Sequence, residues 1–293
     1  MWWLPLLWIV ADTAERRMIA VAPSESLQVT IAGSGSPVVL IPGLFGAAYG
    51  FRKVIPLISD HHRVIVVEPL AVGTSGRPER ADYSLDAQTT RVAAALDSLN
   101  VRQATVAAHS LGAGLAFRLA YRRPDLVAAV ISLDGGPAER AATGGLRRAA
   151  TWAPWVKAFG GVSLVRRKIR ESLVRASGDT SWVSDDVVIG YTEGAARDLD
   201  GTLKAYLRMA ESREHEKLGP HLGEVRCPVT LLLGAAPHPE AVSAREIELL
   251  HARLALLRTD SIAGVGHHIH EERPDLVAQA IEALAASPLA AAR

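Results

Sequence analysis

One serine in this sequence stands where its neighbours favour chemistry. Ser110 follows an apolar run that begins at Ala104, and a helix-period pattern with a leucine at every fourth position comes directly after it. Ala108 and Gly112 are small, as a tight strand-to-helix turn around a serine requires. Such a turn exposes the hydroxyl at a helix N-terminus, whose amides and dipole stabilise an oxyanion. We expect Ser110 to be a nucleophile; the alternative is a serine that only caps the helix.

Acids and histidines elsewhere in the sequence could take part in catalysis or bind a metal. Asp134 follows the apolar run 127–133, and in a parallel sheet its strand would end at the same edge as the strand before Ser110. His267, His268 and His270 lie close enough in sequence to suggest a metal site. No fourth ligand stands at a spacing typical of such sites, so we expect neither a metal nor a cofactor.

The elements needed to position these residues alternate along the chain. Apolar runs of strand length are followed by helix-period stretches, which predicts an α/β fold with a doubly wound, mostly parallel sheet. A polar break between two short apolar runs, 18–22 and 27–32, predicts a hairpin before that sheet. The expected strands are 38–41, 63–67, 104–109, 127–133, 229–233 and 256–261, and the expected helices include 84–99, 241–253 and one that ends near 284.

The segment between 138 and 224 interrupts this alternation, because it shows helical periodicity without a clear strand. We therefore expect an inserted helical cap at 138–224, a core formed by 18–137 and 225–293, and an N-terminal arm at 1–17. The arm opens with an apolar, tryptophan-rich stretch, 1–11, which at about 1.5 Å per residue is too short to span a bilayer of about 30 Å. We expect it to pack on the domain or to contact a membrane surface peripherally.

Several of these segments resemble the α/β-hydrolase superfamily. The Ser110 turn is similar to its nucleophile elbow, Gly-x-Ser-x-Gly, with alanine at the first glycine. The loop after 38–41 resembles the oxyanion loop, with Pro42 in place of histidine, and Gly-Val-Gly-His ending at His267 resembles the histidine loop. The resemblance covers about 18–286 and implies a capped serine hydrolase of the esterase and lipase type. It assigns Ser110 as nucleophile, His267 as general base, and the Leu44 and Leu111 amides as oxyanion hole.

The acid of the triad departs from the usual pattern. Most members of the superfamily carry it a few residues after the strand that corresponds to 229–233, where this chain reads Gly-Ala-Ala-Pro-His-Pro and offers Glu240 as its first carboxylate. Other branches use the preceding strand end, where Asp134 stands. We assign the acid to Asp134 and keep Glu240 as the rival. The alternative for Asp134 is a turn residue that caps its own backbone.

The predicted reaction is hydrolysis of a small or medium carboxylic ester or lactone through an acyl-serine intermediate. A carbon–carbon bond hydrolase of the same fold and a non-catalytic ligand-binding member remain as alternatives. Dehalogenase and epoxide hydrolase chemistry is disfavoured, because members of the superfamily with those activities carry an aspartate at the position of Ser110.

Composition limits the classes of molecule that the protein is expected to bind. The net charge is +1 and no recognition motif for nucleic acid is present, so we expect a small-molecule ester substrate and no nucleic-acid partner. The single cysteine, Cys227, excludes an intramolecular disulfide. We expect a cytoplasmic protein that could associate with a membrane through its arm, and the sequence leaves secretion open.

Overall fold

The computed structural model describes residues 14–141 and 160–285. Their centre is an eight-stranded sheet with the order β1-β2-β4-β3-β5-β6-β7-β8. The pairings of β2 with β1 and with β4 are antiparallel, whereas β3 to β8 pair in parallel. The predicted hairpin and the predicted doubly wound sheet are thereby confirmed. The strands are β1 Glu15–Ala22, β2 Glu25–Ala32, β3 Ser36–Ile41, β4 His62–Val67, β5 Ala104–His109, β6 Val127–Leu133, β7 Val229–Gly234 and β8 Leu257–Ile262.

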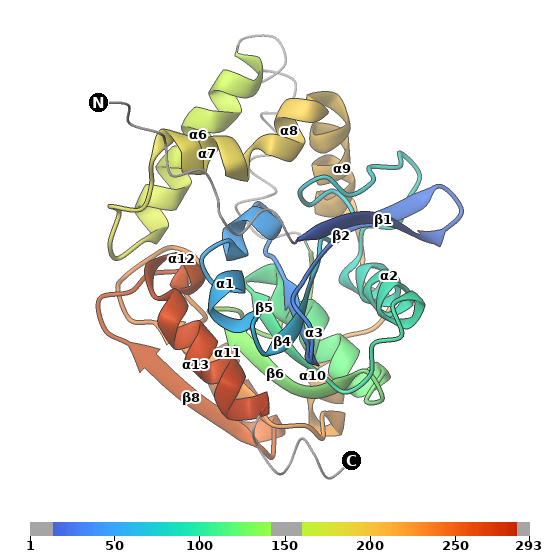
Figure 1. Cartoon of the computed structure of the whole chain (residues 1–293), viewed down its shortest axis with the longest axis vertical. Helices are drawn as coiled ribbons and strands as arrows, with labels where there is room; N and C mark the ends of the chain where they lie inside the picture. Colours follow the sequence, from blue (N-terminus) through green and yellow to red (C-terminus); the bar gives the residue numbers. More distant parts are fainter. Residues whose placement is uncertain (1–13, 142–159, 286–293) are drawn as a thin grey trace.

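Helices cover both faces of the sheet (Figure 1). One face packs on α2 (Leu85–Ser98), α3 (Leu111–Arg122) and α11 (Ala244–Arg253), and the other packs on α1 (Ile55–Ile58) and α13 (Pro274–Ala285). Every residue of β5 and β6 is buried. A strand covered on both faces is mostly apolar, which explains why the central strands read as nearly continuous apolar runs.

The described part of the segment between β6 and β7 is helical. It contains α6 (Gly161–Ala176), α7 (Asp185–Tyr191), α8 (Glu193–Arg197), α9 (Leu199–Glu211), α10 (Leu218–His221) and the short η2 (Leu222–Glu224). Figure 1 shows α6 to α9 gathered beyond one end of the sheet. Several contacts join this group to the loops there; among them, the Tyr206 hydroxyl donates to the Leu44 carbonyl at 3.2 Å, and the His267 N–H donates to the Ala176 carbonyl at 2.7 Å.

The helix expected from 241 begins only at Ala244, because Ser243 caps it and forms a capping box with Glu246. The apolar stretch 1–11 lies outside the described residues. Within the described ranges, no helix is both long and apolar enough to cross a membrane.

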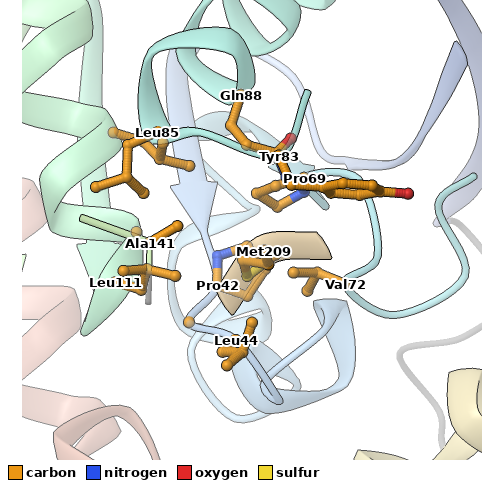
Figure 2. Close-up of a pocket in the computed structure, with 13 residues that line it drawn as sticks. Pro42, Leu44, Pro69, Val72, Tyr83, Leu85, Gln88, Leu111, Ala141 and Met209 are labelled. Carbon is orange, nitrogen blue, oxygen red and sulfur yellow. The ribbon is translucent and has the colours of Figure 1, made fainter. Parts of the chain in front are cut away.

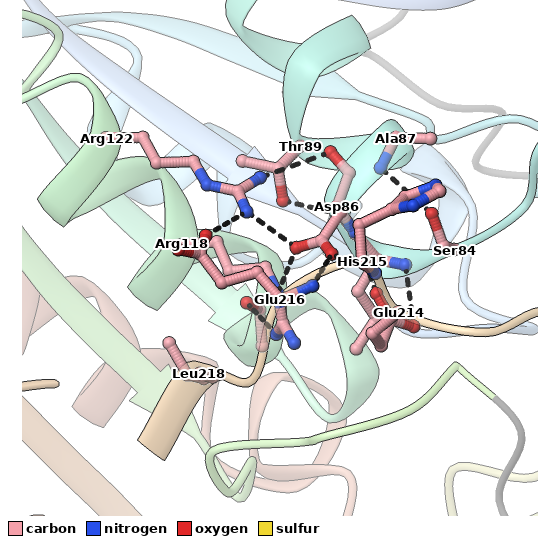
Figure 3. Close-up of polar contacts among 12 residues, drawn as sticks. Ser84, Asp86, Ala87, Thr89, Arg118, Arg122, Glu214, His215, Glu216 and Leu218 are labelled. Carbon is pink, nitrogen blue, oxygen red and sulfur yellow. Dashed lines mark hydrogen bonds and ion pairs between the residues drawn. The ribbon is translucent and has the colours of Figure 1, made fainter. Parts of the chain in front are cut away.

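A buried polar network holds α3, the helix that follows Ser110, in place (Figure 3). Asp86 on α2 accepts hydrogen bonds at Oδ1 from Arg118 Nε (3.1 Å) and Arg122 Nη2 (2.7 Å), both on α3. Its Oδ2 accepts from the backbone N–H groups of His215 (2.8 Å) and Glu216 (2.9 Å), just before α10. Asp86 is 5% exposed and Arg118 is fully buried. One carboxylate therefore joins α2, α3 and the chain that leads back to the sheet.

We expect Asp86→Ala to lower the free energy of unfolding by about 3–5 kcal/mol, because it leaves the buried Arg118 guanidinium without its counter-charge. Denaturant unfolding followed by tryptophan fluorescence measures the loss. Asp97→Ala is the matched control on the same helix, since its carboxylate is 38% exposed and pairs with Arg123 at the surface, where an ion pair contributes below about 1 kcal/mol. Equal losses in the two variants would contradict the prediction.

Candidate active site

Ser110 lies at the sharp turn between β5 and α3. Its backbone angles are φ 53° and ψ −121°, a left-handed conformation that a residue with a side chain rarely adopts. Gly112 makes the turn possible: a Cβ there would lie 2.7 Å from the Ile41 carbonyl oxygen, so a larger residue would push α3 away from β3. The backbone thus matches the strained turn expected around this serine.

The two amides expected to form an oxyanion hole border this turn. A Cβ on Gly43 would lie 3.1 Å from Ser110 Cβ, so the 42–46 loop runs directly against the serine. Leu111 is the first residue of α3. Neither the Leu44 nor the Leu111 N–H donates to another group in the part of the chain that the structure describes. Both N–H groups are therefore available to a developing oxyanion. They are backbone donors, so the histidine side chain that Pro42 replaces is not needed for them.

His267 and Asp134 meet although they are far apart in the sequence. His267 Nδ1 lies 2.7 Å from Asp134 Oδ2, and Oδ1 of the same carboxylate accepts the Gly234 N–H at 3.1 Å. Asp134 is 1% exposed and has a φ of 48°, which directs its side chain across the sheet edge to β7. This carboxylate caps a neighbouring strand and does not cap its own backbone. Glu240 is exposed in the loop before α11, and its side chain takes no part in this contact.

The structure adds His238, which we did not single out from the sequence. Its Nε2 lies 3.3 Å from Asp134 Oδ2, without the alignment of a hydrogen bond, and its side chain is fully buried. His238 stands in the loop after β7, where the superfamily pattern would place an acid. Its place in this loop could have identified His238 from the sequence, because a residue there reaches the site even when it is not a carboxylate.

His109 also belongs to this region. It directly precedes Ser110, its Nε2 lies 3.0 Å from the His267 carbonyl oxygen, and the two ring centroids are 4.6 Å apart. His109 therefore joins the serine turn to the histidine loop. The loop is held from the other side by α6, through the bond from the His267 N–H to the Ala176 carbonyl.

Burial determines the protonation states of Asp134 and His267. It raises the pKa of Asp134 to about 6, against the opposing effects of His238 and the Gly234 N–H. It also lowers the pKa of His267, so the neutral imidazole is the stable form at neutral pH. With Nδ1–H donated to Asp134, the lone pair of His267 lies on Nε2, where it can accept a proton.

An apolar pocket lies next to the expected oxyanion hole. Figure 2 shows Leu44 and Leu111 on its wall together with side chains from several elements. Gln88, the polar side chain in this lining, is occupied by the Leu70 backbone, to whose N–H and carbonyl it bonds at 3.0 Å each. The cavity volume is about 20 Å³, room for about one water molecule. The lining also includes Pro42, Pro69, Val72, Tyr83, Leu85, Leu115, Ala141 and Met209.

Comparison with known proteins agrees with this architecture. The family model described as the alpha/beta hydrolase fold matches residues 36–160. An uncharacterized hydrolase of Bacillus subtilis, YugF, is 26% identical over 83% of this chain and 87% of its own length. A 2-hydroxymuconate semialdehyde hydrolase of a Pseudomonas species is 32% identical over 39% of this chain and 41% of its own. The solved structure of the epoxide hydrolase CorEH superposes with a TM-score of 0.77 at 20% identity, covering 92% of this chain and 98% of that one.

Proposed function

The chain belongs to the α/β-hydrolase superfamily, and on that premise we propose that it is a serine hydrolase of small or medium carboxylic esters or lactones. One observation carries the proposal: the buried His267 has its Nδ1 2.7 Å from a buried carboxylate, and its carbonyl bonds to His109, the residue directly before the strained serine at the N-terminus of α3. A histidine held in this tautomer has the chemistry of a general base for a neighbouring hydroxyl.

The proposed reaction has two halves. In the first, Ser110 Oγ attacks the ester carbonyl while His267 Nε2 takes its proton, and the Leu44 and Leu111 amides bind the oxyanion. The intermediate collapses to an acyl-serine as His267 returns the proton to the leaving alcohol. In the second half a water molecule repeats the sequence and releases the acid. Asp134 stays ionised throughout and holds the imidazolium that forms transiently.

The apolar pocket lined by Leu44 and Leu111 indicates the size of the substrate's acyl group. An apolar cavity of about 20 Å³ beside the amides of these two residues has room for a group about as large as a methyl, so it favours a short acyl chain over a long or charged one. A set of p-nitrophenyl esters from acetate to decanoate tests this: kcat/KM is expected to be greatest for the short acyl chains. Absence of turnover for every ester, with fatty acid or ester binding retained, would favour a non-catalytic ligand-binding member instead.

A carbon–carbon bond hydrolase is the second candidate, favoured by the similarity to 2-hydroxymuconate semialdehyde hydrolase. Epoxide hydrolase and haloalkane dehalogenase activity is not proposed, although proteins of those names are among the similar ones, because Ser110 occupies the nucleophile position. If 2-hydroxymuconate semialdehyde is cleaved faster than every ester of the set, the second candidate replaces the first.

Turnover is expected to fall as the pH drops below about 6, the value to which burial raises the pKa of Asp134. A proton taken up by the Asp134 and His267 pair either removes the negative charge or occupies the base, and both prevent proton abstraction from Ser110. We expect log(kcat/KM) to decrease with a slope of about one per pH unit on the acid side. Tryptophan fluorescence at each pH separates this limb from acid unfolding. A flat profile down to pH values well below 6 would refute the assignment.

His238→Gln is expected to move this acid limb to higher pH. The electrostatic effect of His238 lowers the pKa of both Asp134 and His267, so its removal lets the pair take up a proton more readily. A change confined to packing would lower kcat/KM at all pH values without shifting the limb. His251→Gln, a surface change on α11, serves as the control.

A further inference from the structure

Three histidines form a compact buried cluster beside the proposed triad. His109, His268 and His270 are 4%, 8% and 1% exposed, and their ring centroids are 4.3 to 5.9 Å apart. One ring nitrogen from each lies within 4.8 Å of the others. The sequence suggested His267, His268 and His270 as neighbours; the fold joins His267 to Asp134 and brings His109 from the end of β5 into its place.

Hydrogen bonds fix where the lone pairs of two of these rings lie. His109 Nε2 faces the His267 carbonyl oxygen at 3.0 Å, and because a carbonyl can only accept, Nε2 carries the hydrogen. His270 Nε2 lies 3.4 Å from the Tyr191 hydroxyl, which donates its own hydrogen to Glu271 Oε1 at 2.9 Å and therefore accepts from the ring. In both residues the lone pair is left on Nδ1.

These lone pairs are not used within the protein. The Nδ1 atoms of His109, His268 and His270 have no hydrogen-bond partner among the residues that the structure describes. An unsatisfied buried donor or acceptor costs about 1–3 kcal/mol, and three unpartnered ring nitrogens in one cluster call for a ligand. Neutral imidazole is the form in which histidine binds metal ions.

We propose that His109, His268 and His270 bind a divalent transition-metal ion of the zinc class, with water as the fourth ligand. Three imidazoles without a carboxylate suit zinc, copper or nickel and do not suit calcium or magnesium. Tetrahedral zinc with Zn–N bonds of about 2.0–2.1 Å needs ligand nitrogens about 3.4 Å apart, so small ring rotations would close the site. The contacts of His109 with the His267 carbonyl and of His270 with Tyr191 are the outer hydrogen bonds such ligands usually have.

The ion would have a structural role. It would link the residue before Ser110 to the two histidines that follow His267, and so fix the distance between nucleophile and base. Arg52 and Lys53 already pair with Glu271 nearby, so little negative charge is left to offset the ion. We therefore expect weaker binding than in a thiolate zinc site.

A second histidine group, His238 and His267 with Asp134, is the rival position. There, the His267 ring nitrogen and the carboxylate already share a hydrogen bond of 2.7 Å, which an ion would have to break. The two positions predict opposite effects of mutation, so binding measurements on the full chain can separate them.

The test is calorimetric titration of chelator-treated full-length protein with Zn²⁺. We expect one ion per chain, with affinity reduced by more than about 100-fold in His268→Phe and in His270→Phe, since loss of a ligand exceeds the 10–100-fold effect of an outer-shell change. His238→Gln is the matched control and should keep the affinity of the wild type. No binding by the wild type, or loss of binding in His238→Gln alone, overturns the proposal.

X-ray absorption at the zinc edge of the wild-type protein covers the case in which the phenylalanine variants do not fold. Three imidazole ligands without a carboxylate are expected, whereas two imidazoles with a carboxylate would place the ion on Asp134 and reject the proposed site. Labelling of Ser110 by a fluorophosphonate probe, measured in the same samples, reports on the serine chemistry independently of metal binding.

Discussion

Replacement of Ser110 by alanine is expected to lower ester turnover by about 10⁴–10⁶, because a triad acts as one unit and little of its effect survives the loss of the nucleophile. The serine lies in a left-handed turn at the N-terminus of α3, so the hydroxyl is held for attack before substrate arrives. Stability should be unchanged, since the Ser110 side chain does not cap the helix. The measurement is kcat on the best ester of the set described above.

Covalent labelling gives a second measurement of the same prediction. Ser110 should be the residue that a fluorophosphonate probe modifies, and His267→Ala should slow that labelling sharply by removing the base. Ser177→Ala is a close control, because this serine directly follows α6, next to the histidine loop, but gives its hydroxyl to the Leu173 carbonyl. Persistent labelling of the Ser110→Ala protein would show that another residue is the nucleophile.

The central strands could be predicted from the sequence because burial on both faces makes them largely apolar, with few polar residues such as Thr105 and Ser132. The run 127–133 is β6 without any change of bounds. The edge was harder: β1 begins at Glu15, three residues before the expected run, because an exposed edge strand tolerates the polar Glu15, Arg16 and Arg17. A local signal decided the start of α11, where the Ser243 capping box outweighed the apolar pattern.

The site could be predicted only as far as its parts are local. The turn at Ser110 and the loop at His267 each carry a sequence pattern, so both were found without the fold. The contacts of His109 and His238 depend on how β5, β6 and β7 lie side by side, and no spacing along the chain encodes that order. For the same reason the sequence did not bring His109 together with His268 and His270, because His109 is 159 positions before His268 in the chain.

The acid of the proposed triad is either Asp134 or Glu240. Replacement of Asp134 by asparagine is expected to lower kcat by about 10⁴, as in serine proteases. An asparagine keeps the shape and the bond from the Gly234 N–H, so the fold should persist. However, its amide group can donate to His267 Nδ1, which would move the ring hydrogen to Nε2 and leave no base facing Ser110. The negative charge that stabilises the imidazolium is lost as well.

Glu240→Gln is the matched variant, because Glu240 is the other carboxylate that the sequence offered. Its side chain is exposed before α11, whereas Asp134 Oδ2 lies 2.7 Å from His267 Nδ1, so we expect kcat in Glu240→Gln to stay within about twofold of the wild type, as for other surface changes. Both variants should unfold at the wild-type denaturant concentration to make the comparison valid. Near-normal turnover in Asp134→Asn with collapse in Glu240→Gln would transfer the role of the acid to the loop after β7, and would require that loop to close onto His267 when substrate binds.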